Sequence, residues 1–159
     1  DPYYLVHKAK ELQYHTKMIN SGRYVNDSMG RYIGKKVVKK IISQGKNILG
    51  AHVLVMGMTF KENVSDIRNS KVADIINEFK DFDVMDPFAS PLEVLQEYGI
   101  RLVERPGKKY DAVVVAVAHT TYLKLDESYF MSITNEHAVL ADVKGVYRGS
   151  IHQMIYWSL

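Results

Sequence analysis

The chain has 159 residues, a formal net charge of +3, 47% apolar residues and 25% charged residues. These values are typical of a globular protein with one good core, and they exclude a low-complexity chain. No apolar run approaches the roughly 20 residues that cross a bilayer, so we expect no membrane partner and a cytoplasmic location. The six histidines lack metal-like spacing and there is no cysteine, which predicts no metal site, no disulfide and no thiol nucleophile.

The charge is divided unevenly along the chain. Residues 1–50 hold ten Lys/Arg and three Asp/Glu, or +7, whereas residues 51–159 hold eleven and fifteen, or −4. A basic half can indicate nucleic-acid binding. Here the lysines at positions 35, 36, 39 and 40 are more typical of a solvated helix face, so we expect no nucleic-acid partner.

The first 43 residues predict two helices. Asp1 and Pro2 are a helix cap and a first helical residue, and this short helix should run to about Tyr14. From about Thr16 to Ser43, apolar residues recur every three or four positions and predict one long helix. They are Met18, Val25, Met29, Ile33, Val37 and Ile41.

This long helix is expected to do more than cover its own domain. At a rise of 1.5 Å per residue it spans roughly 40 Å, so part of its apolar stripe should meet another chain; packing within the chain alone is the alternative. Gly22, Gly30 and Gly34 lower helix propensity, which is tolerable if they permit close helix approach. Arg23 and Asn26 share one face and predict either a polar cleft or an exposed surface.

A turn around Gly45 predicts a boundary between a helical segment, residues 1–46, and a second domain, residues 47–159. In the second part, expected strands at 51–56, 82–85, 100–103, 112–117 and 138–142 alternate with expected helices at 70–79, 91–98 and 127–133. This alternation implies a parallel sheet with right-handed crossovers. We therefore predict an α/β fold: a Rossmann-like parallel sheet with helices on both faces, preceded by the helical segment.

The stretch from Val53 to Ser70 reads as strand, polar loop and helix start. Gly57 stands alone where a dinucleotide fingerprint would have three glycines, so a pyrophosphate is not expected to bind in the usual dinucleotide manner. Lys61 and Arg68 lie in the loop at the carboxyl end of the strand, where open α/β sheets bind ligands. They suggest a phosphate-bearing ligand; the alternative is two solvated cations.

Three more residues follow expected strands and so belong to the same sheet edge. Asp86 is either a ribose contact or, with the following proline, a turn residue. His119 is either a neighbour of the ligand or incidental. Lys144 could share a cleft with Lys61 and Arg68, although a strand-end turn explains it too.

The residues Gly57–Asn63 followed by Asp66–Ser70 resemble the signature of the UDP-sugar 6-dehydrogenases, most closely the bacterial branch that acts on UDP-N-acetylhexosamines. The resemblance covers nearly the whole chain. It implies a C-terminal fragment that contains the dimerisation helix and the UDP-sugar domain but lacks the NAD domain and the nucleophilic cysteine. The parent enzyme would oxidise C6 of a UDP-hexosamine to a carboxylate with two NAD, and this fragment alone would be inactive.

The resemblance also implies roles for single residues. Arg68 would reach the NAD, and Asp1 would lie four residues after the missing cysteine, as a tentative catalytic residue or only a helix cap. Residues that would contact or face the UDP-sugar are Arg23, Asn26, Phe60, Lys61 and Lys144. Two other functions stay open at this point: a non-catalytic nucleotide-sugar binding module and a structural dimerisation fragment.

Overall fold

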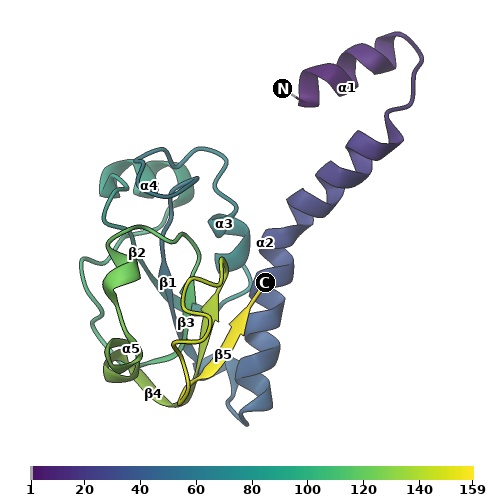
Figure 1. Cartoon of the computed structure of the whole chain (residues 1–159). Helices are drawn as coiled ribbons and strands as arrows, with labels where there is room; N and C mark the ends of the chain where they lie inside the picture. The colour runs from purple at the N-terminus through teal and green to yellow at the C-terminus, as the bar shows by residue number, and fades with distance from the viewer. Residues whose placement is uncertain (1) are drawn as a thin grey trace.

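The computed structural model describes residues 2–159, so Asp1 lies outside the described residues. Figure 1 shows a twisted sheet flanked by helices, with one long helix that extends well beyond it. The elements in chain order are α1 (Pro2–Glu11), α2 (Lys17–Ser43), η1 (Ile48–Gly50), β1 (His52–Met56), α3 (Val72–Ile76), β2 (Asp81–Met85), α4 (Pro91–Tyr98), β3 (Tyr110–Val115), η2 (Tyr122–Lys124), α5 (Glu127–Ile133), β4 (Thr134–Asp142) and β5 (Ile155–Ser158).

The sheet has the order β2-β1-β3-β4-β5, and every pair of neighbouring strands is parallel. The chain adds β2 on one side of β1 and then returns to add β3 on the other side. The order of the strands therefore reverses between β1 and β3, and at such a point the loops beyond the strand ends open a crevice. The predicted α/β fold is confirmed, and it places the loops after β1 and β3 side by side.

Two expected details of the sheet were wrong. Residues 100–103 form only an isolated bridge, between Leu102 and Val84, because a single residue pair aligns there before the chain turns away. The strand β5 was missed because a half-buried run of four residues is too short for a recognisable period. The helix expected at 70–79 is also shorter, at Val72–Ile76.

The core has one layer on each face of the sheet. On one face, Ile33, Val37 and Ile41 of α2 pack with Val53 and Val55 of β1 and with the apolar sides of α3 and α4. On the other face, apolar residues of the sheet pack with η2, α5 and the segment before β5. The residues of this second layer include Leu54, Met56, Val113 and Val115 of the sheet and Tyr122, Phe130 and Tyr147 outside it.

Two glycines let α2 lie directly against α3. A Cβ on Gly30 would come within 2.6 Å of the Asp74 Cβ, and one on Gly34 within 2.8 Å of the Ile75 carbonyl oxygen. A Cβ on Gly22 would meet no atom within 4 Å. The expectation of close helix approach is therefore confirmed for Gly30 and Gly34, whereas Gly22 has no such contact within this chain.

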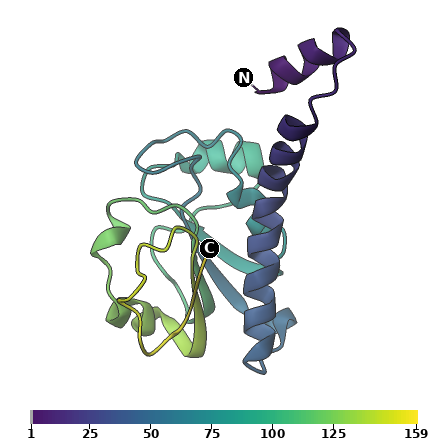
Figure 2. The same ribbon diagram turned by 45° about the vertical axis from the view of Figure 1, so that its right-hand side comes forward.

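Only the C-terminal half of α2 belongs to this core. Figures 1 and 2 show its N-terminal half extending past the sheet and leading back to α1. Met18 is 89% exposed and Val25 is 56% exposed, although both belong to the apolar stripe. The division of the chain at residues 46 and 47 stays a prediction. Among residues 2–159, no helix is both long enough and apolar enough to span a membrane.

Candidate functional site

The site begins where β1 ends, at Gly57. This residue has φ = +97°, and a Cβ there would lie 2.5 Å from the Val117 Cβ. Only glycine combines this backbone conformation with so close an approach. Gly57 therefore turns the chain out of the sheet beside the end of β3 and starts a loop that runs to Ser70.

The buried carboxylate of Asp86, directly after β2, anchors the start of this loop. One oxygen accepts the backbone N–H groups of Met58 (2.6 Å) and Thr59 (3.1 Å), and the other accepts those of Phe88 (2.7 Å) and Ala89 (3.0 Å). Burial raises the pKa of Asp86, but hydrogen bonds from His119 and these amides outweigh it and lower the pKa to about 2. Asp86 is thus a turn residue, as one of the two expectations had it, and its oxygens are occupied.

His119 connects the loop after β3 to this anchor. Its side chain is fully buried, and its Nε2 lies 3.0 Å from the Asp86 carboxylate and 3.3 Å from the Thr59 hydroxyl. Its Nδ1 accepts the backbone N–H of Asn63 at 3.0 Å. A nitrogen that accepts carries no proton, so the neutral ring carries its proton on Nε2 and donates it towards Asp86. His119 therefore joins three loops from three neighbouring strands.

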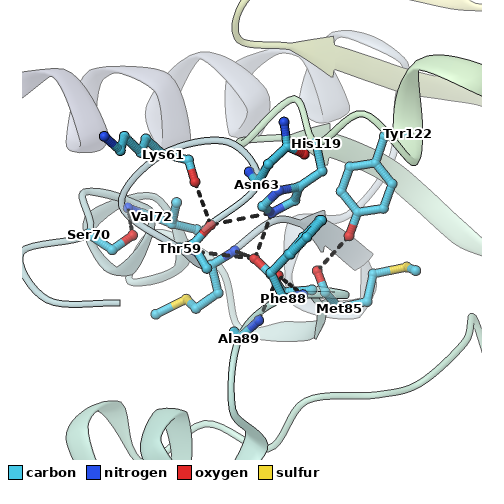
Figure 3. Close-up of polar contacts among 12 residues, drawn as sticks. Thr59, Lys61, Asn63, Ser70, Val72, Met85, Phe88, Ala89, His119 and Tyr122 are labelled. Atoms are coloured by element: carbon cyan, nitrogen blue, oxygen red, sulfur yellow. Dashed lines mark hydrogen bonds and ion pairs between the residues drawn. The ribbon is translucent and has the colours of Figure 1, made fainter. Parts of the chain in front are cut away.

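The side chain of Asn63 forms a second link between the loop after β1 and the loop after β3. Asn63 has φ = +59°, a left-handed conformation in which asparagine is favoured among residues other than glycine. Its side-chain oxygen accepts both the backbone N–H and the hydroxyl of Thr120, each at 3.0 Å. Figure 3 shows Thr59, Asn63 and Phe88 around His119, while the Lys61 side chain points away from them.

The residues between Thr59 and Asn63 are thereby held while their side chains stay accessible. The Thr59 hydroxyl donates to the Lys61 carbonyl oxygen (3.0 Å), and the Phe60 N–H donates to the Asp66 carbonyl oxygen (2.7 Å). The Phe60 side chain is 59% exposed, and Lys61 is exposed as well. Two side chains predicted to bind substrate thus stand on an ordered loop.

Lys144 lies close to this loop, on the segment that follows β4. Its ammonium forms an ion pair with Glu62, which lowers the pKa of that carboxyl through their hydrogen bond. The buried Asp142 fixes the segment by accepting the N–H of Gly145 (2.9 Å) and of Tyr147 (2.7 Å). The structure therefore brings Lys144 next to Glu62, the residue that follows Lys61. This is expected if both loops lie at the same edge of the sheet.

Arg68 pairs with an acidic residue of its own loop. Its guanidinium is 82% exposed and makes two hydrogen bonds to Asp66, of 2.9 and 2.8 Å. The bonds from Arg68 lower the pKa of Asp66 to about 2. The pair borders an open hollow of about 480 Å³ whose other charged residues, Glu93 and Glu97, are acidic. Neither Lys61 nor Lys144 borders this hollow, and a cleft common to all three residues stays a prediction.

A second hollow, of about 890 Å³, separates α2 from the loop after β1. Asn26 and Phe60 border it from opposite sides, so the structure brings these two predicted residues to one space. Arg23 is not among the residues that line it, although its guanidinium carbon lies 3.4 Å from the centre of the ring of Tyr3, which is one of them. The hollow is rich in acidic groups, and its charged lining residues are Asp27, Lys71, Asp74 and Glu97.

The sequence reasoning missed the role of Asn63 and left that of His119 open. The available signal was their position, since both lie just beyond the carboxyl ends of strands that the fold makes neighbours. Asp1 cannot be placed, because it lies outside the described residues. Among residues 2–159 no group of three His, Asp or Glu side chains is arranged to hold a metal ion.

Comparison with known proteins identifies the family. Residues 54–149 match the model of the UDP-glucose/GDP-mannose dehydrogenase family, UDP binding domain. The chain belongs to this family. It is 40% identical over 149 residues to a UDP-N-acetyl-D-glucosamine 6-dehydrogenase of Pseudomonas aeruginosa, with 91% of this chain and 35% of that protein covered.

Solved structures agree with the fold. The UDP-N-acetyl-mannosamine dehydrogenase of S. aureus has a TM-score of 0.73 and 26% identity, over 99% of this chain and 36% of that one. An NDP-N-acetyl-D-galactosaminuronic acid dehydrogenase of Methanosarcina mazei has a TM-score of 0.82 at 19% identity, over 98% and 36%. The chain thus spans about a third of these relatives and corresponds to the UDP-binding part of the family.

Proposed function

We propose that this chain is the UDP-sugar-binding part of a cytoplasmic, NAD-dependent dehydrogenase that oxidises C6 of a UDP-N-acetylhexosamine. The family match supports the UDP-binding role. The 40% identity to a UDP-N-acetyl-D-glucosamine 6-dehydrogenase supports an N-acetylhexosamine as the sugar. The chain has no cysteine, so a thiol nucleophile and the NAD-binding domain would have to come from outside these 159 residues.

The observation that carries this proposal is the meeting of two lysine-bearing loops at the carboxyl edge of the sheet. Lys61 follows β1 and Lys144 follows β4, and the Glu62–Lys144 ion pair brings these loops together. Among the described residues, the Lys61 ammonium has no ion-pair partner, which leaves its charge free for an anionic ligand. A diphosphate is a ligand of this kind.

The hollow between α2 and the loop suits a different part of the ligand. Asp27, Asp74 and Glu97 border it beside a single lysine, Lys71, which already pairs with Asp27 at 3.0 Å. This surplus of negative charge repels a diphosphate. In our proposal the phosphates therefore lie towards Lys61, beside the Glu62–Lys144 ion pair, and the uncharged hydroxyl and amide groups of the sugar face Asn26 and Phe60.

Calorimetric titration of the chain with UDP and with UDP-N-acetylglucosamine tests the proposal. Loss of one charge-assisted hydrogen bond costs roughly 1.5–3 kcal/mol, so Lys61→Ala should weaken UDP binding about ten- to a hundredfold. Lys80→Ala is the matched control, because Lys80 is also an exposed lysine but precedes β2 at the opposite sheet edge. Equal affinities in both variants, or no UDP binding by the unaltered chain, would refute the proposed site.

We also propose that the enzyme is a homodimer joined through α2. The N-terminal half of this helix and α1 leave several large apolar side chains exposed, and a contiguous exposed apolar surface is typical of an interface. These residues are Tyr4, Leu5, Met18, Tyr24 and Val25. The other functions considered, a non-catalytic module or a purely structural fragment, have no comparable support.

A further inference from the structure

We propose that His119, held as the Nε2–H tautomer by Asp86, positions the loop segment Phe60–Asn63 for binding of the UDP-sugar. This inference rests on the proposed function and adds to it a residue that does not itself touch the ligand. His119 follows β3 at the point where the strand order reverses. It therefore lies beneath the loop that carries Phe60 and Lys61.

Aromatic rings and hydrogen bonds together hold the imidazole ring. Its centre lies 4.8 Å from that of the Phe88 ring and 5.5 Å from that of the Tyr122 ring, in tilted and edge contacts. No part of the His119 side chain reaches solvent. The neighbouring rings confine the plane of the imidazole, and the hydrogen bonds to Asn63 and Asp86 fix the directions of its two nitrogens.

Both nitrogens are used, and they act on opposite ends of the same segment. Through Nε2, His119 supports Asp86, which holds the amides of Met58 and Thr59 before the exposed residues. Through Nδ1, it holds the amide of Asn63 after them. The segment is thus fixed on both sides of Phe60 and Lys61.

This arrangement differs from that of a histidine that merely fills the core. A core position would be served equally well by an apolar ring, whereas here each nitrogen has a partner whose identity depends on the tautomer. Movement of the proton to Nδ1 would place two donors, Nδ1–H and the Asn63 N–H, against each other. A ligand that binds a loop fixed in advance does not bear the entropy cost of ordering it.

Three substitutions separate the two nitrogens. In His119→Asn, the side-chain carbonyl can take the place of Nδ1 and accept the Asn63 amide. In His119→Gln, the amide group can take the place of Nε2 and donate to Asp86, while Asn63 loses its acceptor. His119→Phe keeps a ring but removes both interactions.

The controls separate loop position from general stability. Val114→Ala removes buried volume from β3 without touching the loop, so it lowers the melting temperature and leaves UDP binding unchanged. His152→Gln exchanges an exposed histidine beyond β4 for the same residue as in His119→Gln. Both controls should bind UDP within twofold of the unaltered chain.

The experiment combines nuclear magnetic resonance with titration by UDP. In the unaltered 159-residue chain, the ¹⁵N shifts of the His119 ring should report the Nε2–H tautomer, and the Asn63 amide should exchange slowly with solvent. His119→Gln and His119→Phe should speed that exchange and weaken UDP binding by roughly tenfold, the equivalent of one hydrogen bond. His119→Asn should stay nearer to the unaltered chain in both measurements.

Several results would overturn the inference. A proton on Nδ1 in the unaltered chain would do so without any variant. The inference would also fail if His119→Gln and His119→Phe bound UDP as tightly as Val114→Ala does. It would fail as well if the exchange rate of the Asn63 amide were the same whichever residue stands at position 119. If the unaltered chain binds no UDP while Asn63 exchange still depends on His119, the proposed function fails and the positioning of the loop stands.

Discussion

At the scale of single residues, the site depends on buried groups that never meet solvent. Asp86 uses both carboxylate oxygens to hold backbone amides of two loops. These hydrogen bonds are stronger when the carboxylate is charged. The exposed residues Phe60 and Lys61 owe their position to that buried charge. The stability of the protein in acid should therefore report on the same carboxylate.

Asp86→Asn should lower the free energy of unfolding by about 2–3 kcal/mol near neutral pH, since charged hydrogen bonds are replaced by fewer neutral ones. The pKa of Asp86 is lowered from 3.8 to about 2 in the folded state. Stability from this shift, about 2 kcal/mol, is therefore present above pH 3.8 and is lost as the pH falls towards 2. Urea unfolding between pH 6 and pH 2 should show the variant and the unaltered protein converging in acid; a constant difference would contradict this.

Arg68 is expected to act on the cofactor instead of the UDP-sugar, because neither Lys61 nor Lys144 lines the hollow that Arg68 borders. In the complete dehydrogenase, Arg68→Ala should weaken NAD binding about ten- to a hundredfold and leave UDP-sugar binding nearly unchanged. Arg68→Lys should restore little, since a lysine cannot keep the two-pronged contact to Asp66. Dissociation constants for both ligands decide this; equal losses for both would mean a structural role.

At the scale of secondary-structure elements, α2 has two halves with different surroundings. Its C-terminal half packs against α3 and the sheet, and its N-terminal half extends beyond them (Figure 2). The glycines within it differ accordingly, because a Cβ on Gly30 or Gly34 would meet α3, whereas a Cβ on Gly22 would meet nothing within 4 Å among residues 2–159. These differences lead to two predictions.

Gly30→Ala and Gly34→Ala should each destabilise the protein by about 1–3 kcal/mol, since the new methyl group overlaps atoms of α3. Gly22→Ala is the matched control. It should raise stability by up to about 1 kcal/mol, because alanine favours the helix and no atom obstructs it. Thermal unfolding of the three variants checks this; similar effects at all three positions would mean that helix propensity alone decides.

Val25→Glu should prevent dimerisation while leaving the fold intact, because Val25 is 56% exposed within one chain and would be buried between two. Ile33 is unsuitable for this test, since it is only 5% exposed and belongs to the core of its own chain. Lys39→Glu, on the half of α2 that covers the sheet, is the control. Sedimentation should give a dimer for the unaltered chain and the control; a monomer in both would refute the dimer.

At the scale of the whole molecule, the chain spans about a third of its relatives and contains no cysteine. We expect it to bind UDP-N-acetylglucosamine and yet to produce no NADH when NAD is added, because a covalent route through a thiol needs a cysteine from elsewhere. Calorimetry and the absorbance of NADH measure the two halves of this prediction. NADH formation by the pure chain would contradict it.

The sequence by itself determined the features that depend on near neighbours in the chain. The apolar run of β3 predicts a buried central strand, and the three- to four-residue stripe from residue 16 to residue 43 predicts α2. The long, distinctive loop from Gly57 to Ser70 indicated the family, and its cations marked the carboxyl edge of the sheet. Local patterns of this kind can be recognised without knowledge of the tertiary contacts.

Only the tertiary structure decided which distant residues meet. The hydrogen bonds that join Asp86, His119 and Asn63 come from loops after three different strands, so they exist only once the strand order β2-β1-β3 is set. The same holds for the contact of Lys144 with Glu62 and for the half of α2 that is buried. Each depends on packing between segments that are far apart in the chain, which spacing along the sequence does not encode.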